Sequence, residues 1–500
     1  MLVGLDIGTT GAKAVVFDDC GTVLSTAFEE YAVISGPGGM AEQDAEGVWR
    51  SARTVLVRAI ASCGLKTVEA IGVSVQGDAV IPVDRAGNAL GPALLGMDYR
   101  SANAARAFAN TFGDRQLFER TGMRPHALNS ITKILYYKEL NPQVFETAAA
   151  FATYADFIAM KLGGERVIDT SMASRTMACT LESTEWDDEL LAFGGITRDR
   201  LGQIRPSGTV IGHLSSDIAR EAGLSGTTMI STGGHDQCCA ALGAGVLSPG
   251  QAVVSTGTAE VFSTCLERAT TNDGMYESFF PCYRHVLPGA YFTFSLNHIG
   301  GILLRWFKET FCHKEIEEAQ RRGMDIYHYL DQSMSPNPQK LFIVPHFNGS
   351  GTPWCDMDAT GAIVGLTLST GIPDLYRALL ESQTYELALN LEAFGASGID
   401  IRSISAVGGG SKSADWLQIK ANILNRPVRV PVCPESAALG AAILAGSAIG
   451  LWSSVREGAD RMVGFKKEYQ PDANMASKYT GLLEEYRGIY PALKRLREEV

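Results

Sequence analysis

The first residues whose types and spacing could do chemistry lie near the N-terminus. A mainly apolar run, Leu2–Ile7, is interrupted by Gly8-Thr9-Thr10-Gly11 and resumes at Ala14–Phe17, which predicts two strands joined by a tight turn. The backbone N–H groups at the tip of such a turn suit an anion such as phosphate. Asp6 precedes the turn, where it could hold a Mg²⁺ shared with a polyphosphate, and Lys13 follows it, where it could neutralise phosphate charge. Taken alone, the pattern fits an ordinary hairpin at least as well.

A second carboxylate with chemical potential is Asp236. The residues from Thr227 to Thr232 predict a strand that ends at Gly233-Gly234, and a helix of small residues is expected from Cys239 to Gly245. This places Asp236 on an exposed turn, where it could act as a general base, cap the helix, or do both. The adjacent His235 has no partner pattern, so a structural or supporting role is expected.

Polar residues also follow a predicted strand at Val68–Val75. Gln76 and Asp78 come at its end, where open α/β sheets place ligand contacts, so both are candidates for binding a hydroxylated substrate. Turn formation explains Asp78 equally well. Asp98 precedes a predicted helix and is either its N-cap or another substrate contact.

The second half of the sequence repeats the pattern of the first. Gln251–Phe262 predicts a strand, a turn at Thr256-Gly257-Thr258 and a second strand, which suggests duplicated domains that face a phosphate chain from opposite sides. A further glycine-rich turn, Gly408–Ser413, lies between a predicted strand at Ile404–Val407 and a helix from Asp415. Such glycines let a flat ring or a phosphate approach the backbone, although the spacing is not that of a Walker A loop.

Chain length and charge restrict the number of domains that position these residues and the class of partner they can bind. A chain of 500 residues is too long for one core and predicts two domains, with the best boundary at Ser248-Pro249-Gly250. The net charge of −12 and the lack of a basic block exclude nucleic acid as an expected partner.

Cysteine usage and hydropathy indicate where the protein is found. The ten cysteines contain no CxxC pair, which favours buried thiols in a reducing cytosol, so a cytoplasmic location is expected. The uncharged stretch Ala437–Trp452 has only 16 residues and is mostly Ala and Gly, which predicts a closely packed core helix rather than a membrane span.

Several separated segments, taken in order, resemble the FGGY carbohydrate kinases, the family of glycerol kinase, xylulokinase, gluconate kinase and erythritol kinase. The resemblance rests on their order and spacing over nearly the whole chain. The segments are LDIGTTGAKAVVFD, GMAEQD with Trp49, GGHDQCCAALGAGV, PHFNGSGTPWCDMDATGAIVGLT, and GGGSKSADWLQI followed by PESAALGAAILA; IDTSMASRTM with Trp186-Asp187-Asp188 is also similar to a glycerol kinase segment.

The resemblance implies an α/β fold of two actin-like ATPase (ribonuclease H-like) domains with a central interdomain cleft. Residues 1–246 would bind the sugar and supply the catalytic base, and residues 247–500 would bind the nucleotide, with ATP and Mg²⁺ as cofactors. Carried over by position, the roles are metal binding by Asp6; phosphate binding by Gly8, Thr9, Thr10, Lys13, Thr256, Gly257 and Thr258; nucleotide binding by Gly301, Arg305, Gly409, Gly410 and Ser413; catalysis by Asp236; and substrate binding by Gln76, Asp78, Asp98, Asp236 and Gln237.

Departures from the family pattern bear on the substrate. This chain has Gly77-Asp78 where glycerol kinases carry Arg-Glu and xylulokinases Met-His, and is more similar here to erythritol kinases and L-xylulokinases. If Asp78, Asp98 and Asp236 all line the pocket, a neutral substrate is favoured over gluconate, because unpaired like charges cost binding.

The predicted function is therefore ATP-dependent phosphorylation of a hydroxyl of a small neutral sugar or polyol, such as xylulose or an erythritol-like polyol. The alternatives left open are a glycerol, hexulose or gluconate kinase of the same family, and an actin-like ATPase that phosphorylates no small molecule. We also expect the protein to form a homodimer and to have no membrane partner.

Overall fold

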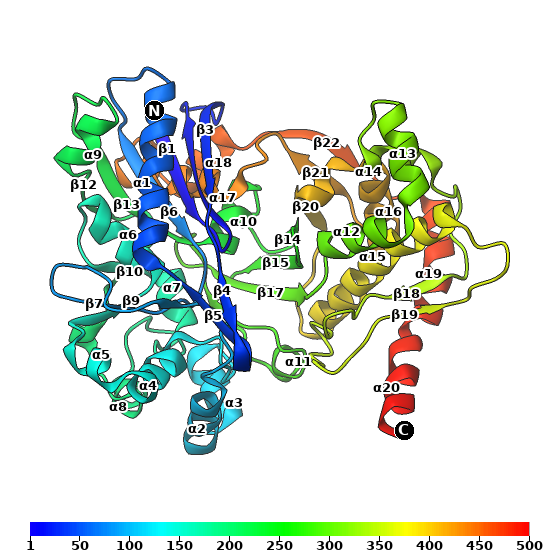
Figure 1. Cartoon of the computed structure of the whole chain (residues 1–500), viewed down its shortest axis with the longest axis horizontal. Helices are drawn as coiled ribbons and strands as arrows, with labels where there is room; N and C mark the ends of the chain where they lie inside the picture. The colour runs from blue at the N-terminus through cyan, green and yellow to red at the C-terminus, as the bar shows by residue number, and fades with distance from the viewer. Residues whose placement is uncertain (500) are drawn as a thin grey trace.

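Two mixed β-sheets, one in each lobe, organise the computed structural model, which describes residues 1–499 (Figure 1). The first sheet has the order β12-β13-β6-β1-β2-β3 and the second β16-β17-β15-β14-β20-β21-β22. The strands of the first are β1 (Leu2–Ile7), β2 (Gly11–Phe17), β3 (Val23–Glu30), β6 (Ala70–Val75), β12 (Val210–His213) and β13 (Met229–His235). Those of the second are β14 (Gln251–Thr256), β15 (Glu260–Leu266), β16 (Tyr283–Arg284), β17 (Tyr291–Asn297), β20 (Ser403–Gly408), β21 (Val428–Pro431) and β22 (Phe465–Tyr469).

The same strand arrangement occurs in both sheets. β1 pairs antiparallel with β2 and parallel with β6, β2 pairs antiparallel with β3, and β6 pairs parallel with β13. In the second sheet β14 takes the place of β1, with β15 and β17 on its antiparallel side and β20 and β21 on its parallel side. The duplication inferred from the two hairpins is thus a repeat of whole sheets.

The strand register brings the chemically interesting loops together. Val75 pairs with both Ile7 and His235, the last residues of β1 and β13. The residues that follow these strands therefore leave the sheet at one edge, where parallel strands place ligand contacts. In the second sheet Thr256 pairs with Gly408 in the same way.

Helices and small strand pairs surround the sheets (Figure 1). One small sheet has three strands, β4 (Ile34–Gly36), β5 (Met40–Gln43) and β8 (Ala93–Leu94). The pairs are β7 (Ile81–Val83) with β9 (Ala150–Ala152), β10 (Val167–Asp169) with β11 (Gln203–Arg205), and β18 (Phe342–Val344) with β19 (Ala362–Val364). The helices before residue 250 are α1 (Ala45–Ser62), α2 (Ala102–Phe112), α3 (Asp114–Thr121), α4 (Ser130–Leu140), α5 (Pro142–Thr147), α6 (Tyr154–Leu162), α7 (Thr170–Arg175), α8 (Asp188–Gly194), α9 (Ser216–Glu221) and α10 (Asp236–Gly243). Those after it are α11 (Asp273–Glu277), α12 (Gly301–Phe311), α13 (His313–Arg321), α14 (Ile326–Ser333), α15 (Ile372–Ala396), α16 (Ala414–Leu424), α17 (Ser436–Ala448), α18 (Val455–Met462), α19 (Ala473–Arg487) and α20 (Ile489–Glu499).

Helix α17 belongs to the second half of the chain but packs on the sheet of the first. It contacts β1, β6, β13 and α10. A Cβ atom on Gly4 would lie 1.8 Å from the carbonyl oxygen of Ala438, and one on Gly72 would lie 2.0 Å from that of Ala441, so glycine permits this close approach. The predicted packed core helix is confirmed, and none of the helices within residues 1–499 is long and apolar enough to cross a membrane.

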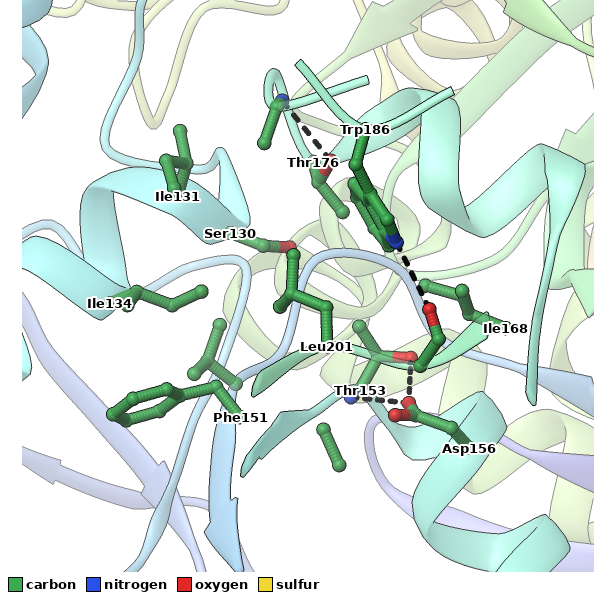
Figure 2. Close-up of a pocket in the computed structure, with 14 residues that line it drawn as sticks. Ser130, Ile131, Ile134, Phe151, Thr153, Asp156, Ile168, Thr176, Trp186 and Leu201 are labelled. Carbon is green, nitrogen blue, oxygen red and sulfur yellow. Dashed lines mark hydrogen bonds between the residues drawn. The ribbon is translucent and has the colours of Figure 1, made fainter. Parts of the chain in front are cut away.

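A small cavity in the first lobe illustrates how tightly that lobe is packed (Figure 2). Its volume is about 10 Å³, room for about one water molecule. The indole of Trp186 donates to the carbonyl of Gly202 at 3.0 Å, and Asp156 accepts from the backbone of Thr153 at 2.6 Å as part of the α6 capping box. The polar groups at this cavity therefore serve the fold, and a sugar does not fit it.

Candidate active site

The turn after β1 is held by a network of amide side chains. The side chain of Gln76 donates to the carbonyl of Gly8 at 3.3 Å and to Oε1 of Gln43 at 3.0 Å, and its own oxygen accepts from the hydroxyl of Thr9 at 3.2 Å. Gln43 in turn donates to the carbonyl of Thr9 at 2.6 Å. Gln76, predicted as a substrate contact, thus organises the turn after β1 in this structure, and Gln43 is a partner that the sequence patterns did not indicate.

Asp6 and Lys13 lie on paired strands beneath this turn. Asp6 pairs with Lys13 across β1 and β2, and its Oδ1 accepts from the hydroxyl of Ser74 at 2.7 Å. Burial raises the pKa of Asp6 to about 6, although Ser74 and the charge of Lys13 act against the shift. Nζ of Lys13 lies 2.6 Å from Oε2 of Glu435, the residue before α17.

Asp236 begins α10 at the same edge of the sheet. The prediction of an exposed turn is wrong: β13 continues through Gly233 and Gly234 to His235, with a bulge that the glycines accommodate, and the helix follows at once. Oδ1 of Asp236 accepts from the backbone N–H of Gln237 at 2.6 Å, and its side chain is 28% exposed. Burial and the nearby carboxylate of Asp6 raise the pKa of Asp236 to about 7. A carboxylate with such a pKa suits general-base chemistry at neutral pH.

Asp78 has a charge partner that the sequence analysis missed. Asp78 adopts a left-handed backbone conformation (φ 69°), which aspartate tolerates, and is buried. Both of its carboxylate oxygens accept from Arg175, the last residue of α7, with Nε 3.1 Å from Oδ1. Nη1 of Arg175 is buried without a hydrogen-bond partner.

Asp98 is not the N-cap of a helix, because α2 begins only at Ala102 with Ser101 before it. Its Oδ2 accepts from the backbone of Ala41 at 3.0 Å and lies 2.6 Å from Nη2 of Arg100. Arg100 also bonds Oε1 of Glu42 at 2.5 Å. The carboxylates of Asp78 and Asp98 are therefore both paired with guanidinium groups, so the unpaired negative charge expected from the sequence is reduced to that of Asp236.

The edge of the second sheet borders a cavity of about 610 Å³, within the size range of small-molecule sites. It lies between the ends of β14 and β20 and helices α12, α14 and α16. Of the residues predicted to bind phosphate or nucleotide, the cavity brings together Thr256, Gly257, Gly301, Gly409, Gly410 and Ser413. Arg305 and Thr258 are exposed and do not line it. Asp325, Tyr327, His328 and Asp331 also line it, and no sequence pattern had pointed to them.

A buried ion pair holds Thr256 in place. The hydroxyl of Thr256 donates to Oε1 of Glu260 at 2.7 Å, and Nζ of Lys420 lies 2.6 Å from the same oxygen. Glu260 and Lys420 are almost fully buried, and Lys420 also lies over the ring of Trp416, which lines the cavity. The threonine hydroxyl is therefore oriented by charged groups from β15 and α16.

The residues around Asp6 fit a magnesium ion. The charge of Asp6 raises the pKa of Asp236, and the charge of Glu435 raises the pKa of Asp6, so a cation beside these carboxylates would relieve the repulsion. Oxygen ligands and adjacent phosphates are the partners Mg²⁺ prefers.

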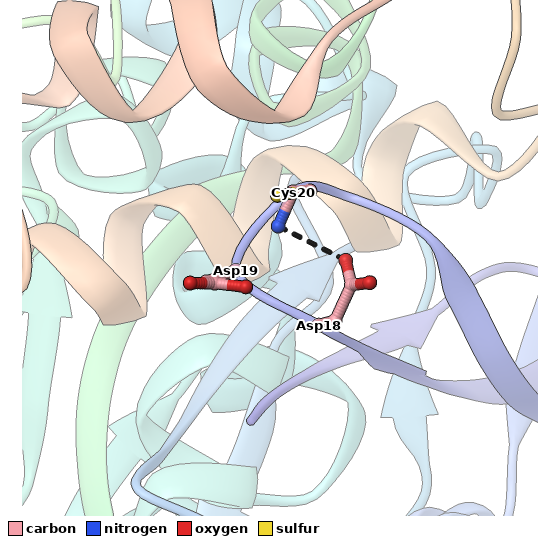
Figure 3. Close-up of side chains that lie close together, drawn as sticks. All are labelled: Asp18, Asp19 and Cys20. Carbon is pink, nitrogen blue, oxygen red and sulfur yellow. Dashed lines mark hydrogen bonds between the residues drawn. The ribbon is translucent and has the colours of Figure 1, made fainter.

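A second acidic cluster has a structural role that explains it without a metal ion. Figure 3 shows Asp18, Asp19 and Cys20 close together in the turn between β2 and β3. Oδ1 of Asp18 accepts from the backbone of Cys20 at 2.9 Å and of Thr22 at 2.7 Å, so this carboxylate stabilises the turn.

Comparisons with known proteins identify relatives of this arrangement. Residues 1–243 match the N-terminal domain model, and residues 252–449 the C-terminal domain model, of the FGGY family of carbohydrate kinases. The autoinducer-2 kinase of Yersinia enterocolitica is 28% identical over 98% of this chain and 94% of its own. The gluconokinase of Bacillus subtilis is 29% identical over 99% and 96%. The crystal structure of xylulose kinase from Rhodospirillum rubrum covers 99% of both chains, with a TM-score of 0.88 and 26% identity. The predicted fold class and the resemblance stated above are confirmed.

Proposed function

This chain belongs to the FGGY family of carbohydrate kinases, and from that membership we propose that it transfers the γ-phosphate of ATP to a hydroxyl of a small neutral sugar or polyol, with Asp236 as the general base. The observation that carries the proposal is the half-buried carboxylate of Asp236 beside Asp6, with a pKa raised to about 7. The division at residues 246 and 247, with the base in the first part and the nucleotide in the second, is part of the proposal.

Phosphoryl transfer is mainly a matter of position and charge. The turn at Gly8, Thr9 and Thr10, together with Lys13, binds phosphates from the first lobe, and Thr256, Gly257 and Thr258 bind them from the second. Gly301, Gly409, Gly410 and Ser413 hold the nucleoside in the large cavity, which Arg305 does not line. Mg²⁺, held by Asp6, supplies positive charge to the phosphate oxygens when bound. Asp236 takes the proton of the substrate hydroxyl as its oxygen attacks the γ-phosphorus and ADP leaves.

The paired charges support a neutral substrate by a different route from the sequence argument. Arg175 and Arg100 already neutralise Asp78 and Asp98, so neither guanidinium has a full charge to offer a carboxylate substrate. Asp78, Asp98 and Gln237 supply oxygen and nitrogen atoms for substrate hydroxyl groups, and Oε1 of Gln237 is buried without a partner. The amide of Gln76 is already bonded to Gly8, Gln43 and Thr9. A ketopentose such as xylulose, or an erythritol-like polyol, meets these conditions.

Gluconate is the second candidate. The gluconokinase of Bacillus subtilis is 29% identical to this chain, and the free Nη1 of Arg175 could donate to a carboxylate. The charge of that guanidinium is shared with Asp78, which is why gluconate ranks below a neutral acceptor.

An ADP-release assay across glycerol, erythritol, threitol, xylulose, ribulose, fructose, gluconate and autoinducer-2 tests the proposal. We expect a neutral acceptor to give the highest kcat/KM, and Asp236→Asn to lose roughly 10²–10⁴-fold in turnover while still binding ATP. Asp217→Asn, a change on the exposed surface of α9, is the matched control. Gluconate as the best acceptor would refute the neutral substrate, and ADP release that no acceptor stimulates would refute the kinase and favour an ATPase.

A further inference from the structure

The residue before the proposed base contacts a tyrosine from the other sheet. Nδ1 of His235 lies 3.2 Å from the hydroxyl of Tyr283 in β16, and the two rings meet edge to face. Both side chains are buried, at 4% and 0% exposure. Nε2 of the same imidazole lies 3.2 Å from Oδ1 of Asp236. His235 therefore sits between a hydroxyl of the second sheet and the carboxylate of the first.

The environment decides which atom carries the proton. Burial and the charge of Arg175 hold the pKa of His235 well below its usual value, so the imidazole is neutral. Burial raises the pKa of Tyr283 well above its usual value, so its hydroxyl keeps its proton. The ionised carboxylate of Asp236 can only accept, so the neutral imidazole carries its hydrogen on Nε2, and Nδ1 is left to accept from the hydroxyl of Tyr283. That hydrogen is on the side of Asp236.

Both hydrogen-bond donors near Asp236 therefore approach the same carboxylate oxygen. Oδ1 accepts from the backbone N–H of Gln237 at 2.6 Å and has Nε2 of His235 at 3.2 Å. Two donors on Oδ1 leave Oδ2 as the oxygen available to receive a proton.

Gly77 provides the space that the imidazole occupies. A Cβ atom at this position would lie 2.9 Å from Nε2 of His235 and 3.0 Å from Nε of Arg175. Any larger residue would push the imidazole or the guanidinium aside. Gly77, which stands where related kinases carry arginine or methionine, therefore leaves the space that the His235 imidazole occupies.

We propose that His235, oriented by Tyr283, is the positioning residue for the base: its Nε2–H fixes Oδ1 of Asp236 and leaves Oδ2 to accept the substrate proton. This inference rests on the proposed function, because it assigns a role to a neighbour of the proposed base. It also makes the base sensitive to the position of the second sheet, since Tyr283 lies in β16 of that sheet.

Other titratable groups also face Asp236 and bear on its pH dependence. They are Asp6 on β1, Asp78 after β6, Arg175 on α7, Tyr283 on β16, and Cys238 and Cys239 on α10. The variants below leave all of these in place except Tyr283. A shift in the pH profile therefore reports the hydrogen bond from His235.

The test compares His235→Leu, His235→Gln and Tyr283→Phe with the parent enzyme, using the best acceptor of the assay above. Leucine removes the donor, glutamine can place an amide N–H near the position of Nε2, and phenylalanine removes the hydroxyl that fixes the tautomer. His285→Gln is the control, since His285 is a buried histidine on the second sheet's side that does not contact Asp236.

We expect His235→Leu to lower kcat about 10–100-fold, a part of what a general base contributes, with the KM for ATP within twofold. The acid limb of kcat/KM should move to higher pH, because a lost donor raises the pKa of the carboxylate. His235→Gln should restore most of the activity and the position of the limb, and Tyr283→Phe should lie between. ¹⁵N-histidine spectra should show His235 as the neutral Nε2–H form from pH 6 to 8.

An unshifted acid limb in both His235→Leu and Tyr283→Phe, equal losses in the leucine and glutamine variants, or the Nδ1–H tautomer would each overturn the inference. Asp236→Asn separates this failure from that of the proposed function. If Asp236→Asn is inactive while His235→Leu behaves like the parent, only the positioning role fails. If the parent phosphorylates no acceptor, or Asp236→Asn is fully active, the proposed function fails and the inference with it.

Discussion

Nζ of Lys13 and Oε2 of Glu435 lie 2.6 Å apart, so the cation at the first turn is paired with a carboxylate from the segment that leads into α17. Both side chains are a little over one quarter exposed. A phosphate that reaches Lys13 must therefore compete with Glu435 or share the lysine with it.

Changing the two partners of this pair should have opposite effects on nucleotide binding. Lys13→Met should weaken ATP binding about tenfold, because a hydrogen bond to a charged group contributes about 1.5–3 kcal/mol. Glu435→Gln should not weaken it, and should strengthen it several-fold at low ionic strength because the competing charge is gone. Calorimetric titration with ATP at two salt concentrations measures both. Equal weakening by the two variants would mean that the pair holds the turn together rather than competing with phosphate.

The reaction should depend on pH through Asp236. With a pKa of about 7 in the folded protein, this carboxylate is protonated in acid and cannot accept a proton, so kcat/KM should rise tenfold per pH unit up to about pH 7 and then level. Saturating Mg²⁺ should keep Asp6 ionised, whose pKa is raised to about 6. Samples returned to pH 8 and assayed again control for inactivation. A profile that is flat from pH 5.5 to 8 would contradict the assignment.

The same raised pKa predicts a cost in stability. An Asp236 carboxyl with a folded pKa near 7 and an ordinary value of 3.8 destabilises the folded state increasingly as the pH rises between these values. Asp236→Asn should therefore raise the melting temperature at pH 8, by an amount equivalent to about 4 kcal/mol, and leave it unchanged near pH 4. Scanning calorimetry at both values tests this, with Asp217→Asn as the exposed control. Destabilisation at pH 8 would show that the carboxylate makes favourable contacts instead.

The pair of Glu260 and Lys420 should couple stability to nucleotide binding. Lys420→Met leaves a buried carboxylate unpaired, which costs about 3–5 kcal/mol, and releases the oxygen that orients Thr256. We expect a lower melting temperature and weaker ADP binding. The double variant Glu260→Gln/Lys420→Met should recover most of the stability, because neither charge remains. A double variant as unstable as the single one would show that packing, rather than charge, causes the loss.

Much of the fold could be predicted because local patterns were strong. The apolar runs interrupted by Gly and Thr within Leu2–Phe17 and Gln251–Phe262 predicted both hairpins, and the glycines after β20 predicted one wall of the large cavity. The path of β13 was mispredicted, because Gly233 and Gly234 are ordinary strand breakers, yet a bulge lets the strand continue to His235.

The charge partners in the site could not be predicted, because they join residues far apart in the sequence. Arg175 reaches Asp78 across 97 positions and Glu435 reaches Lys13 across 422. Both lie in segments similar to known kinases, IDTSMASRTM and PESAALG, but the segments name no partner. The prediction of Asp98 as an N-cap was wrong because its carboxylate instead pairs with Arg100 two residues later and accepts from Ala41 in β5, which lies 57 positions away.

Helix α17 packs against β1 and β6 through close backbone contacts at Gly4 and Gly72. The two halves of the chain are therefore not two independent consecutive domains. A fragment that ends at residue 246 lacks the helix that covers one face of its sheet, so a large apolar surface is exposed to solvent. During translation this surface stays exposed until nearly nine tenths of the chain has been synthesised. The first lobe can therefore complete its folding only when the last part of the second lobe is present.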